Sequence, residues 1–523
     1  MNFSLNKKIS VGFSVLALVF LLFFYFFFLA QKIDLITADL GRHLKNGENI
    51  LLRNFAVLSK NFYSYTYPDY PFINHHWGGG LIFFLIFKLG NFIGLHLFFI
   101  FLNLITFLIF FLAAKQESDF KIAFVLSFLL IPLIAERKEL RPEVFSYFFS
   151  AIFFYLLLLY QKNQLKQRYL FLLPLAQIIW VNTHIYFFLG LFLILVFLLE
   201  ELLKKNFLKA KNLLLIFCLS LIMSFFNPFG AKGVFYPFNI FKDYGYRVAE
   251  NQSVWFLENY GLKNPNFFLF KISLIILWLS FIWLVVLNRR KLSFANLMLA
   301  TGFSAMALLA LRNFTLFGFF ALPLTAANLK NSLAKWLTEK KQHRLTARLV
   351  AIIIFLVILI MFIPTYRHYW FSKNYAFGLG LAPGISEAAN FLKKENVKGP
   401  IFNNYDIGSY LIYYLYPQEK VFVDNRPEAY PVDFFQNIYI PMQDNEMKWR
   451  QQDDLYHFNA IIFSYRDLTP WAQKFLIERV KDSQWAPVFA DQYVIIFLKR
   501  NDLNQAIIEK YEIPKTQFII TKA

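Results

Sequence analysis

The chain has a single cysteine, Cys218, among its 523 residues. One cysteine excludes an internal disulfide framework and a cysteine-based metal site, and Cys218 itself lies inside an apolar run. The sequence also lacks a glycine-rich phosphate-binding fingerprint, an internal repeat and a low-complexity linker. Its chemistry must therefore be sought in the placement of its polar residues.

Charge is scarce as well, at 16% of residues, whereas 58% are hydrophobic and 68 are phenylalanine. No soluble domain of this length needs so much apolar surface, and many runs approach the roughly 20 residues that cross a bilayer. The first run, at 10–30, is too long for the core of a signal peptide, so we interpret it as a retained anchor. The composition predicts an α-helical polytopic membrane protein.

We expect about eleven transmembrane helices from the apolar runs. They lie near 10–30, 93–113, 121–135, 144–160, 169–181, 185–199, 212–226, 267–288, 294–310, 314–328 and 347–364. A shorter run, 79–89, ends in Gly90 and Asn91, and we expect it to lie in the interface rather than to cross.

With this count, the basic residues collect in every second connection. By the positive-inside rule those connections are cytoplasmic. Counting 79–89 as a crossing would move every later basic loop outside. The formal charge of +20 is therefore interpreted as a topology signal with anionic headgroup contact, and we expect no nucleic-acid partner. This topology predicts a multi-pass protein of the cytoplasmic (inner) membrane, with its N-terminus in the cytoplasm.

Two domains are expected. Residues 1–364 form the transmembrane bundle, with a first outer loop at 31–78, and residues 365–523 form an extracytoplasmic domain. In the second domain IFNN, KVFVDN, AIIFSY and QYVIIFLKR are typical of strands, and helical patterns alternate with them. This alternation predicts an α/β domain with a largely parallel sheet.

Nearly all polar residues at membrane depth face the outer side, which points to a site there. Asp39 and His43 are four residues apart on a predicted short helix, so they share a face. In surroundings of low dielectric constant, the carboxylate can act as a general base that deprotonates a hydroxyl. The alternative is a solvated interfacial helix with an ordinary Asp–His contact.

His75 and His76 stand just before Trp77, where the chain re-enters the membrane. Two adjacent histidines need a further ligand to hold a metal, and Asp39 or His43 could supply it. The sequence does not require a metal, so a divalent cation is left open.

ERKELRPE at 136–143 is the densest outer charge cluster near the bilayer. Arginine forks bind phosphate, and a phosphate at the membrane surface would belong to a lipid carrier. The alternative is contact of these long side chains with headgroups. The candidate substrate-binding residues on this face are Arg137, Arg141, Glu143, His184, Glu250, Arg312 and Asn313, together with His75 and His76.

The order of these features resembles the GT-C class of membrane glycosyltransferases, including relatives of the protein mannosyltransferases and aminoarabinose transferases. More closely, the chain resembles a broad bacterial group of GT-C-like membrane proteins. The matching segments are DLGRHLKNG, NFYSYTYPDYPFINHHW, ELRPE, WVNTH, SFFNPFG, LRNF and IFNNYDIGSYLIYYLYPQEKVFVDNRPEAY. They occur in the same order and cover nearly the whole chain.

The resemblance implies transfer of a hexosyl or pentosyl group, with inversion, from a polyprenyl-phosphate or diphosphate donor to a glycan, lipid or protein acceptor. Asp39 matches the aspartate that acts on the acceptor, and Arg141 and Arg312 are the leading phosphate partners. Many relatives carry two acidic residues in the first loop, whereas Asp39 is followed by Leu40 and Gly41. This departure leaves the metal requirement open. It also makes a second carboxylate elsewhere in the chain, such as Glu143 or Glu250, a stronger candidate for the site.

In the tail, Asp406, Asp424 and Arg426 match the most distinctive part of the bacterial group. They are candidates for acceptor binding, with a structural ion pair at a strand end as the alternative.

We therefore expect a membrane glycosyltransferase whose site lies between the first outer loop and the helix ends. A lipid or sugar transporter or flippase would instead predict broken helices near the bilayer midplane and inverted repeats. A non-catalytic anchor that presents the C-terminal domain needs one crossing, and it does not explain the polar cluster.

Overall fold

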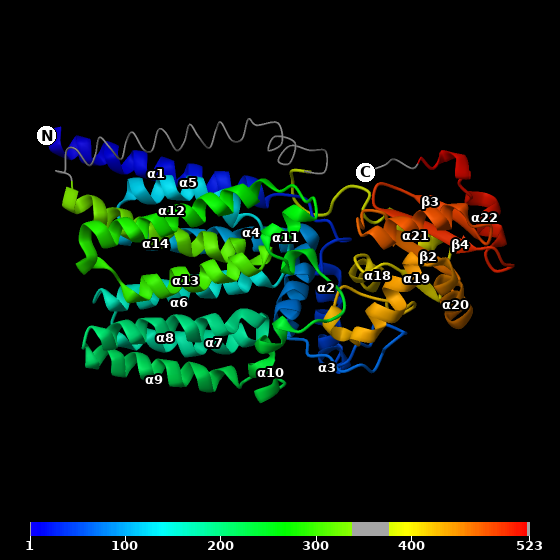
Figure 1. Cartoon of the computed structure of the whole chain (residues 1–523), viewed down its shortest axis with the longest axis horizontal. Helices are drawn as coiled ribbons and strands as arrows, with labels where there is room; N and C mark the ends of the chain where they lie inside the picture. Colours follow the sequence, from blue (N-terminus) through cyan, green and yellow to red (C-terminus); the bar gives the residue numbers. More distant parts are fainter. Residues whose placement is uncertain (1, 337–375, 520–523) are drawn as a thin grey trace. The chain divides into compact units, whose positions relative to one another are not determined.

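The computed structural model describes residues 2–336 and 376–519, whose helices and strands are shown in Figure 1. These residues fall into two units, each made from three stretches of sequence. Unit 1 takes in the described parts of Met1–Lys32, His96–Pro237 and Val248–Leu379. Unit 2 takes in the described parts of Ile33–Leu95, Phe238–Arg247 and Gly380–Ala523.

Unit 1 is built of helices, and each predicted apolar run up to residue 328 overlaps one or two of them. The helices are α1 (Asn2–Leu29), the second part of α4 (Trp77–Glu117), α5 (Phe120–Ile134), α6 (Glu143–Gln161), α7 (Leu172–Thr183), α8 (Phe188–Leu203), α9 (Phe207–Ser224), α10 (Ala231–Phe235), α11 (Val254–Asn259), α12 (Pro265–Asn288), α13 (Phe294–Leu309) and α14 (Phe314–Trp336). The last predicted crossing, 347–364, lies outside the described residues.

Five helical stretches in the described part of the chain are long and apolar enough to cross a membrane. They are Trp77–Glu117, Glu143–Gln161, Ile185–Leu203, Phe207–Ser224 and Pro265–Lys291. Shorter apolar helices at Ser14–Leu29, Phe120–Ile134 and Phe294–Leu309 accompany them. The chain is a multi-pass membrane protein.

Helix α12 illustrates why these segments are helical. Leu279, Ile282 and Val286 are exposed along one face, whereas Phe281 and Leu284 are buried against the bundle. The exposed set recurs at three- and four-residue spacing, as one helical face requires. Apolar side chains that face outward suit hydrocarbon, and a helix satisfies its own backbone groups there.

Helix α4 begins in unit 2 and continues in unit 1. Its backbone leaves the helical region at Gly90 and Asn91, where the φ angles are −138° and 50°. This break coincides with the predicted end of the short run 79–89.

Unit 2 contains a four-stranded sheet with the order β1-β2-β4-β3. The strands are β1 (Ile401–Asn403), β2 (Ala460–Ser464), β3 (Trp485–Ala490) and β4 (Val494–Lys499). Only β1 and β2 pair in parallel, whereas β4 is antiparallel to both of its neighbours. The prediction of a largely parallel sheet is therefore wrong, because the short connection between β3 and β4 can join only antiparallel strands.

The other elements of unit 2 are helical. They are α2 (Leu40–Leu51), α3 (Ala56–Ser59), the start of α4, α17 (Glu387–Lys394), α18 (Gly408–Leu415), α19 (Ile440–Asp444), α20 (Glu446–Tyr456), α21 (Pro470–Lys481) and α22 (Gln505–Tyr511). The predicted strand KVFVDN forms only an isolated bridge, between Val421 and Ser64.

The first loop packs with the C-terminal segment in unit 2, whereas the sequence assigned it to the bundle domain. The Arg42 backbone N–H donates to Ser409 Oγ at 2.9 Å, which joins α2 to α18. Ser64 Oγ donates to the Phe422 carbonyl at 3.0 Å. These contacts arise from side chains more than 300 residues apart, so local patterning could not reveal them. The predicted boundary at 364/365 lies outside the described residues.

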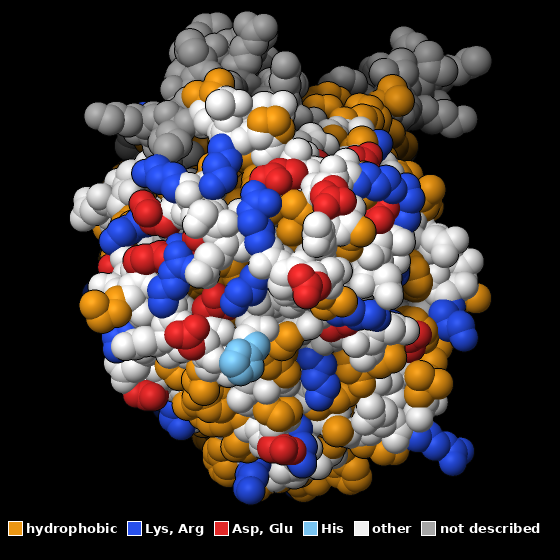
Figure 2. Space-filling model, turned by 90° about the vertical axis from the view of Figure 1, so that its right-hand side faces the viewer, with side chains coloured by type: hydrophobic (Ala, Val, Ile, Leu, Met, Phe, Trp, Pro, Cys, Tyr) orange, Lys and Arg blue, Asp and Glu red, His pale blue; other side chains and the backbone are white. Residues whose placement is uncertain are grey.

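The face of unit 2 seen in Figure 2 mixes acidic and basic side chains, with hydrophobic side chains among them. Neither sign of charge forms a continuous surface on this face.

Close contact between α2 and α18 generates a prediction. A Cβ atom on Gly41 would lie 2.6 Å from the Ser409 carbonyl oxygen and 2.9 Å from Tyr413 Cβ. Because backbone cannot move cheaply, Gly41→Ala should lower the free energy of unfolding by about 1–3 kcal/mol. Thermal unfolding of the purified protein in nanodiscs measures this change. The control is Gly90→Ala, since a Cβ there meets no atom within 4 Å; equal losses in both variants would contradict the packing argument.

Candidate functional site

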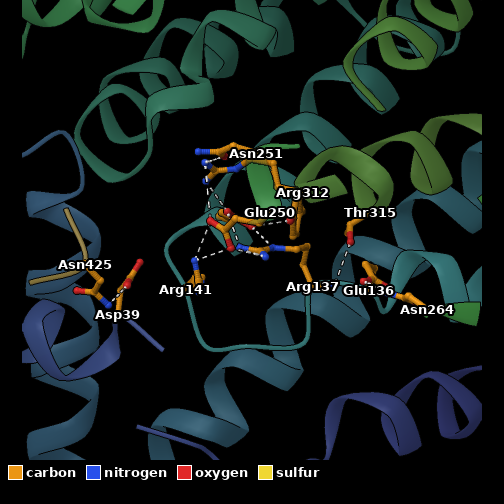
Figure 3. A network of polar contacts seen from close by, with 12 residues as sticks. Asp39, Glu136, Arg137, Arg141, Glu250, Asn251, Asn264, Arg312, Thr315 and Asn425 are labelled. Atoms are coloured by element: carbon orange, nitrogen blue, oxygen red, sulfur yellow. Dashed lines mark hydrogen bonds and ion pairs between the residues drawn. The ribbon is translucent and has the colours of Figure 1, made fainter. Parts of the chain in front are cut away.

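Three arginines and two glutamates form one polar cluster in unit 1 (Figure 3). Arg137 holds Glu143 with a two-pronged contact, Nε to Oε2 at 2.9 Å and Nη2 to Oε1 at 3.0 Å. Arg312 Nη2 donates to Glu143 Oε1 at 2.7 Å. Glu250 accepts from Arg137 Nη1 at 2.7 Å and from Arg141 Nη1 at 2.9 and 3.0 Å.

The cluster is assembled from three connections at helix ends. Arg137 and Arg141 lie between α5 and α6, and Glu143 is the first residue of α6, where a carboxylate suits the positive end of the helix dipole. Glu250 lies on η4 (Ala249–Asn251), and Arg312 on η6 (Leu311–Asn313). Sequence analysis named all five residues, and the structure brings all five together.

Further hydrogen bonds fix this region of unit 1. The Arg137 N–H donates to Thr315 Oγ1 at 3.3 Å. Glu136 accepts from Asn264 Nδ2 at 2.7 Å and also from Asn266, which ties the end of α5 to the start of α12. The loop that carries the arginines is therefore held at both ends.

The charges of the cluster depend on one another. Burial opposes ionisation of Glu250, but the charges of Arg137, Arg141 and Arg312 outweigh it and lower its pKa to about 2. Burial likewise opposes the charge on Arg312, yet Tyr186, Glu143 and Glu250 raise its pKa above the usual value. The cluster thus stays fully ionised at neutral pH, with three positive and two negative groups.

The arginines predicted to contact phosphate therefore contact carboxylates in this structure. The arginines can still donate a further hydrogen bond, because the buried Nε atom of Arg312 has no hydrogen-bond partner among the residues described. Arg312 also lies over the Tyr186 ring, at 5.9 Å from its centroid. Arg137 also experiences the charge of Glu139, a further carboxylate of the same loop, so the unpartnered Arg312 Nε atom is the feature that leaves room for an anionic ligand.

Two other predicted residues of this face lie in the packed interior. Asn313 accepts from the Tyr186 hydroxyl at 2.8 Å and donates to the Met306 carbonyl at 2.8 Å. His184 is fully buried, and its Nδ1 lies 2.7 Å from Ser146 Oγ. These contacts are those of structural residues that satisfy buried polar groups.

Asp39, the predicted general base, lies in unit 2 at the N-cap of α2. Its side chain is 21% exposed and accepts a hydrogen bond from Asn425 Nδ2. His43 follows one turn later and is buried, so its ring contacts that of His76 rather than solvent. Asp39 and His43 thus lie one turn apart at the start of α2, where the Asp39 carboxylate contacts Asn425 and the His43 ring contacts that of His76. That the two side chains share one face for catalysis stays a prediction.

Sequence analysis missed Arg42. Its side chain is 4% exposed, its Nη2 lies 3.9 Å from Asp39 Oδ2, and its buried Nε has no hydrogen-bond partner in the described part of the chain. Arg42 thus places a buried cation beside the carboxylate predicted to be the general base. One local feature of the sequence pointed to it. In DLGRH, Arg42 follows Asp39 by three residues, and one turn of helix brings two side chains at that spacing together.

His75 and His76 stack edge to face with centroids 4.0 Å apart, and the His43 and His76 rings are 5.6 Å apart. Within residues 2–336 and 376–519, no group of three or more His, Cys, Asp or Glu side chains is arranged to hold a metal ion.

The predicted acceptor-binding pair in the tail is a buried ion pair. Arg426 Nε donates to Asp424 Oδ1 at 2.8 Å, and the two side chains are 2% and 0% exposed. Arg426 Nη2 also donates to Asn61 Oδ1 at 2.7 Å, across to the first loop. These contacts favour the alternative role for the pair, which is a structural ion pair rather than acceptor binding. Asp406 is partly exposed in the turn between β1 and α18.

Neither a scan against models of known protein families nor a search of curated proteins finds a match for this chain. Solved structures do match it. The oligosaccharyltransferase AglB from Archaeoglobus fulgidus, solved with an inhibitory peptide and a dolichol-phosphate, aligns with 94% of this chain and 75% of its own, at 13% identity and a TM-score of 0.60. Its apo form aligns with 89% and 71%, at 14% identity and a TM-score of 0.59.

ArnT from Cupriavidus metallidurans in the apo state aligns with 94% of this chain and 99% of its own, at 12% identity and a TM-score of 0.52. AglB and ArnT are both polytopic membrane glycosyltransferases of the GT-C class. The GT-C-like fold that the sequence predicts is therefore confirmed.

The low pKa of Glu250 predicts a pH dependence of stability. Its ordinary value of 4.5 is lowered in the folded protein, so the stability it contributes is present above pH 4.5 and is lost as the pH falls towards about 2. Unfolding midpoints at about pH 6 and pH 3 should therefore differ more in the wild type than in Glu250→Gln, which lacks the titrating group. An identical pH response of the two proteins would contradict the assignment.

Breaking the buried pair of unit 2 should be costly. Asp424→Asn leaves the Arg426 charge buried without its partner, so the free energy of unfolding should fall by about 3–5 kcal/mol. Asp69→Asn is the matched control because Asp69 pairs with Lys60 on the surface, at 81% exposure, where solvent screening leaves an ion pair little effect on stability. Chemical unfolding in nanodiscs compares the two, and similar small losses would argue against a structural role.

Proposed function

We propose that this chain is a membrane glycosyltransferase that moves a sugar from a polyprenyl-phosphate or diphosphate donor to a glycan, lipid or protein acceptor outside the cytoplasm. The fold supports this, because AglB, which shares it, was solved with a dolichol-phosphate. The observation that carries the proposal is the cluster of Arg137, Arg141 and Arg312 in unit 1, which brings three guanidinium groups together around two glutamates.

The cluster suits the leaving group of such a reaction. When the bond from the anomeric carbon to the phosphate oxygen breaks, the electron pair leaves with the lipid phosphate, where negative charge develops. Guanidinium groups fixed in a largely buried site stabilise that charge more strongly than water does. Their planar forks also match the geometry of phosphate oxygens.

Asp39 takes the role of general base. The acceptor oxygen attacks the anomeric carbon from the face opposite the phosphate, so the configuration inverts, and the acceptor proton passes to Asp39. The Asn425 amide orients the carboxylate, and the Arg42 guanidinium lies 3.9 Å from it. Asp406, partly exposed near the start of α18, is the tail residue that we assign to acceptor contact.

Transfer of label from a panel of polyprenyl-phosphate hexoses and pentoses to glycan, lipid and peptide acceptors tests the proposal. With protein in nanodiscs, Asp39→Asn should reduce turnover at least about 100-fold, because general-base assistance is lost, while donor binding is retained. Asp34→Asn is the matched control, since Asp34 lies in the same loop, is 28% exposed and pairs with Arg466. It should stay near wild-type turnover.

Turnover undiminished in Asp39→Asn would remove Asp39 from the base role. If the wild type neither binds nor turns over any lipid-linked sugar, the proposed function is wrong.

A further inference from the structure

We propose that Glu250 is an internal occupant of the arginine cluster, and that the phosphate of the lipid carrier displaces it. This inference rests on the proposed function and adds a gating step to it. The ligand it names is a phosphate monoester headgroup, such as the polyprenyl phosphate released by transfer.

Glu250 meets the arginines as a bound anion would. Its two carboxylate oxygens together accept hydrogen bonds from Arg137 and Arg141 at 2.7 to 3.0 Å, and Oε1 lies 3.9 Å from Arg312 Nη1. All three guanidinium groups thus converge on one carboxylate (Figure 3). An anion with more oxygens could also engage the Arg312 Nε atom, which has no partner among the described residues.

The two glutamates of the cluster differ in how firmly they are held. Glu143 is 7% exposed, belongs to the long helix α6 and also accepts from the Tyr147 hydroxyl at 3.0 Å. Glu250 is 17% exposed and sits on the three-residue η4, between the exposed residues Ala249 and Asn251. Displacing Glu250 disturbs a short connection, whereas displacing Glu143 would disturb a membrane helix.

Few contacts besides Glu250 hold η4 in place. The Leu311 N–H donates to the Gln252 carbonyl at 3.0 Å, and Arg312 Nη1 donates to Asn251 Oδ1 at 2.9 Å. Directly after these residues, Val254 and Leu257 are fully buried and anchor α11. A movement of η4 can therefore stay local.

Charge selects the displacing ligand. With Glu250 withdrawn, the three arginines and Glu143 carry a net charge of about +2 at neutral pH. A phosphate monoester carries about −1.5 to −2 there, whereas a sugar-bearing phosphodiester carries about −1. The opened cluster therefore matches the leaving group best, and the return of Glu250 would help to expel it.

Binding of decaprenyl phosphate to protein in nanodiscs tests the displacement. Glu250→Gln should bind it about tenfold more tightly than the wild type, because the competing carboxylate is gone. Glu143→Gln makes the same change in net charge at a fixed position, so it controls for general electrostatics, and it should not tighten binding. Equal or weaker binding by Glu250→Gln, or equal tightening by both variants, would overturn the inference.

A spin label gives a second readout that does not depend on affinity. The chain has one cysteine, so Ala249→Cys in a Cys218→Ser background can be labelled at a single site. Saturating decaprenyl phosphate should raise the mobility of the label, and Glu250→Gln should raise it without ligand. An unchanged spectrum at saturation would contradict the displacement.

Inorganic phosphate at the same concentration should leave the label unchanged; if it mobilises the label equally, the site takes free phosphate and the link to the lipid carrier fails. If decaprenyl phosphate binds neither the wild type nor Glu250→Gln, the proposed function fails as well. If decaprenyl phosphate binds the wild type but binds Glu250→Gln no more tightly, only the displacement of Glu250 is refuted and the proposed function stands.

Discussion

The need to compensate buried charge controls the helix ends of unit 1 that carry the arginine cluster. An isolated guanidinium or carboxylate costs several kcal/mol to remove from water, and a close, fully hydrogen-bonded partner is required to offset that cost. Arg137 and Glu143 are 8% and 7% exposed, so the charge of either residue would be energetically unfavourable without the other. Glu250 and Arg312 extend the same requirement to two later connections. The positions of these segments therefore depend on one set of ion pairs.

The same ion pairs leave the cluster able to bind an anion. One of its two carboxylates, Glu250, lies on a short, partly exposed segment, and the buried Nε atom of Arg312 has no partner among the described residues. In unit 2 the buried Arg42 lies 3.9 Å from Asp39, and Glu428 also interacts with it electrostatically. In both units arginines therefore lie next to a carboxylate proposed to act, either as a base or as a displaceable ligand.

Much of this could be predicted from the sequence because lipid imposes strong rules. Long apolar runs gave the helices, and charged residues at their outer ends gave the members of the cluster. The pairing of Arg137 with Glu250 could not be predicted, because 113 residues separate them and only tertiary packing joins them. Arg42 was missed because its spacing from Asp39 indicates only a shared helix turn, whereas its burial depends on tertiary packing. Strand β3 was missed because Pro487 interrupts its pattern, which a strand at the sheet edge tolerates.

The central claim is that the arginine cluster binds the phosphate of a lipid carrier. A cryo-electron microscopy structure of the full chain in nanodiscs that contain polyprenyl phosphate tests it most directly. The account predicts phosphate density within hydrogen-bond distance of Arg137, Arg141 and Arg312, with Glu250 moved away from them. Lipid phosphate bound elsewhere, with the Glu250 contacts to Arg137 and Arg141 intact, would contradict it.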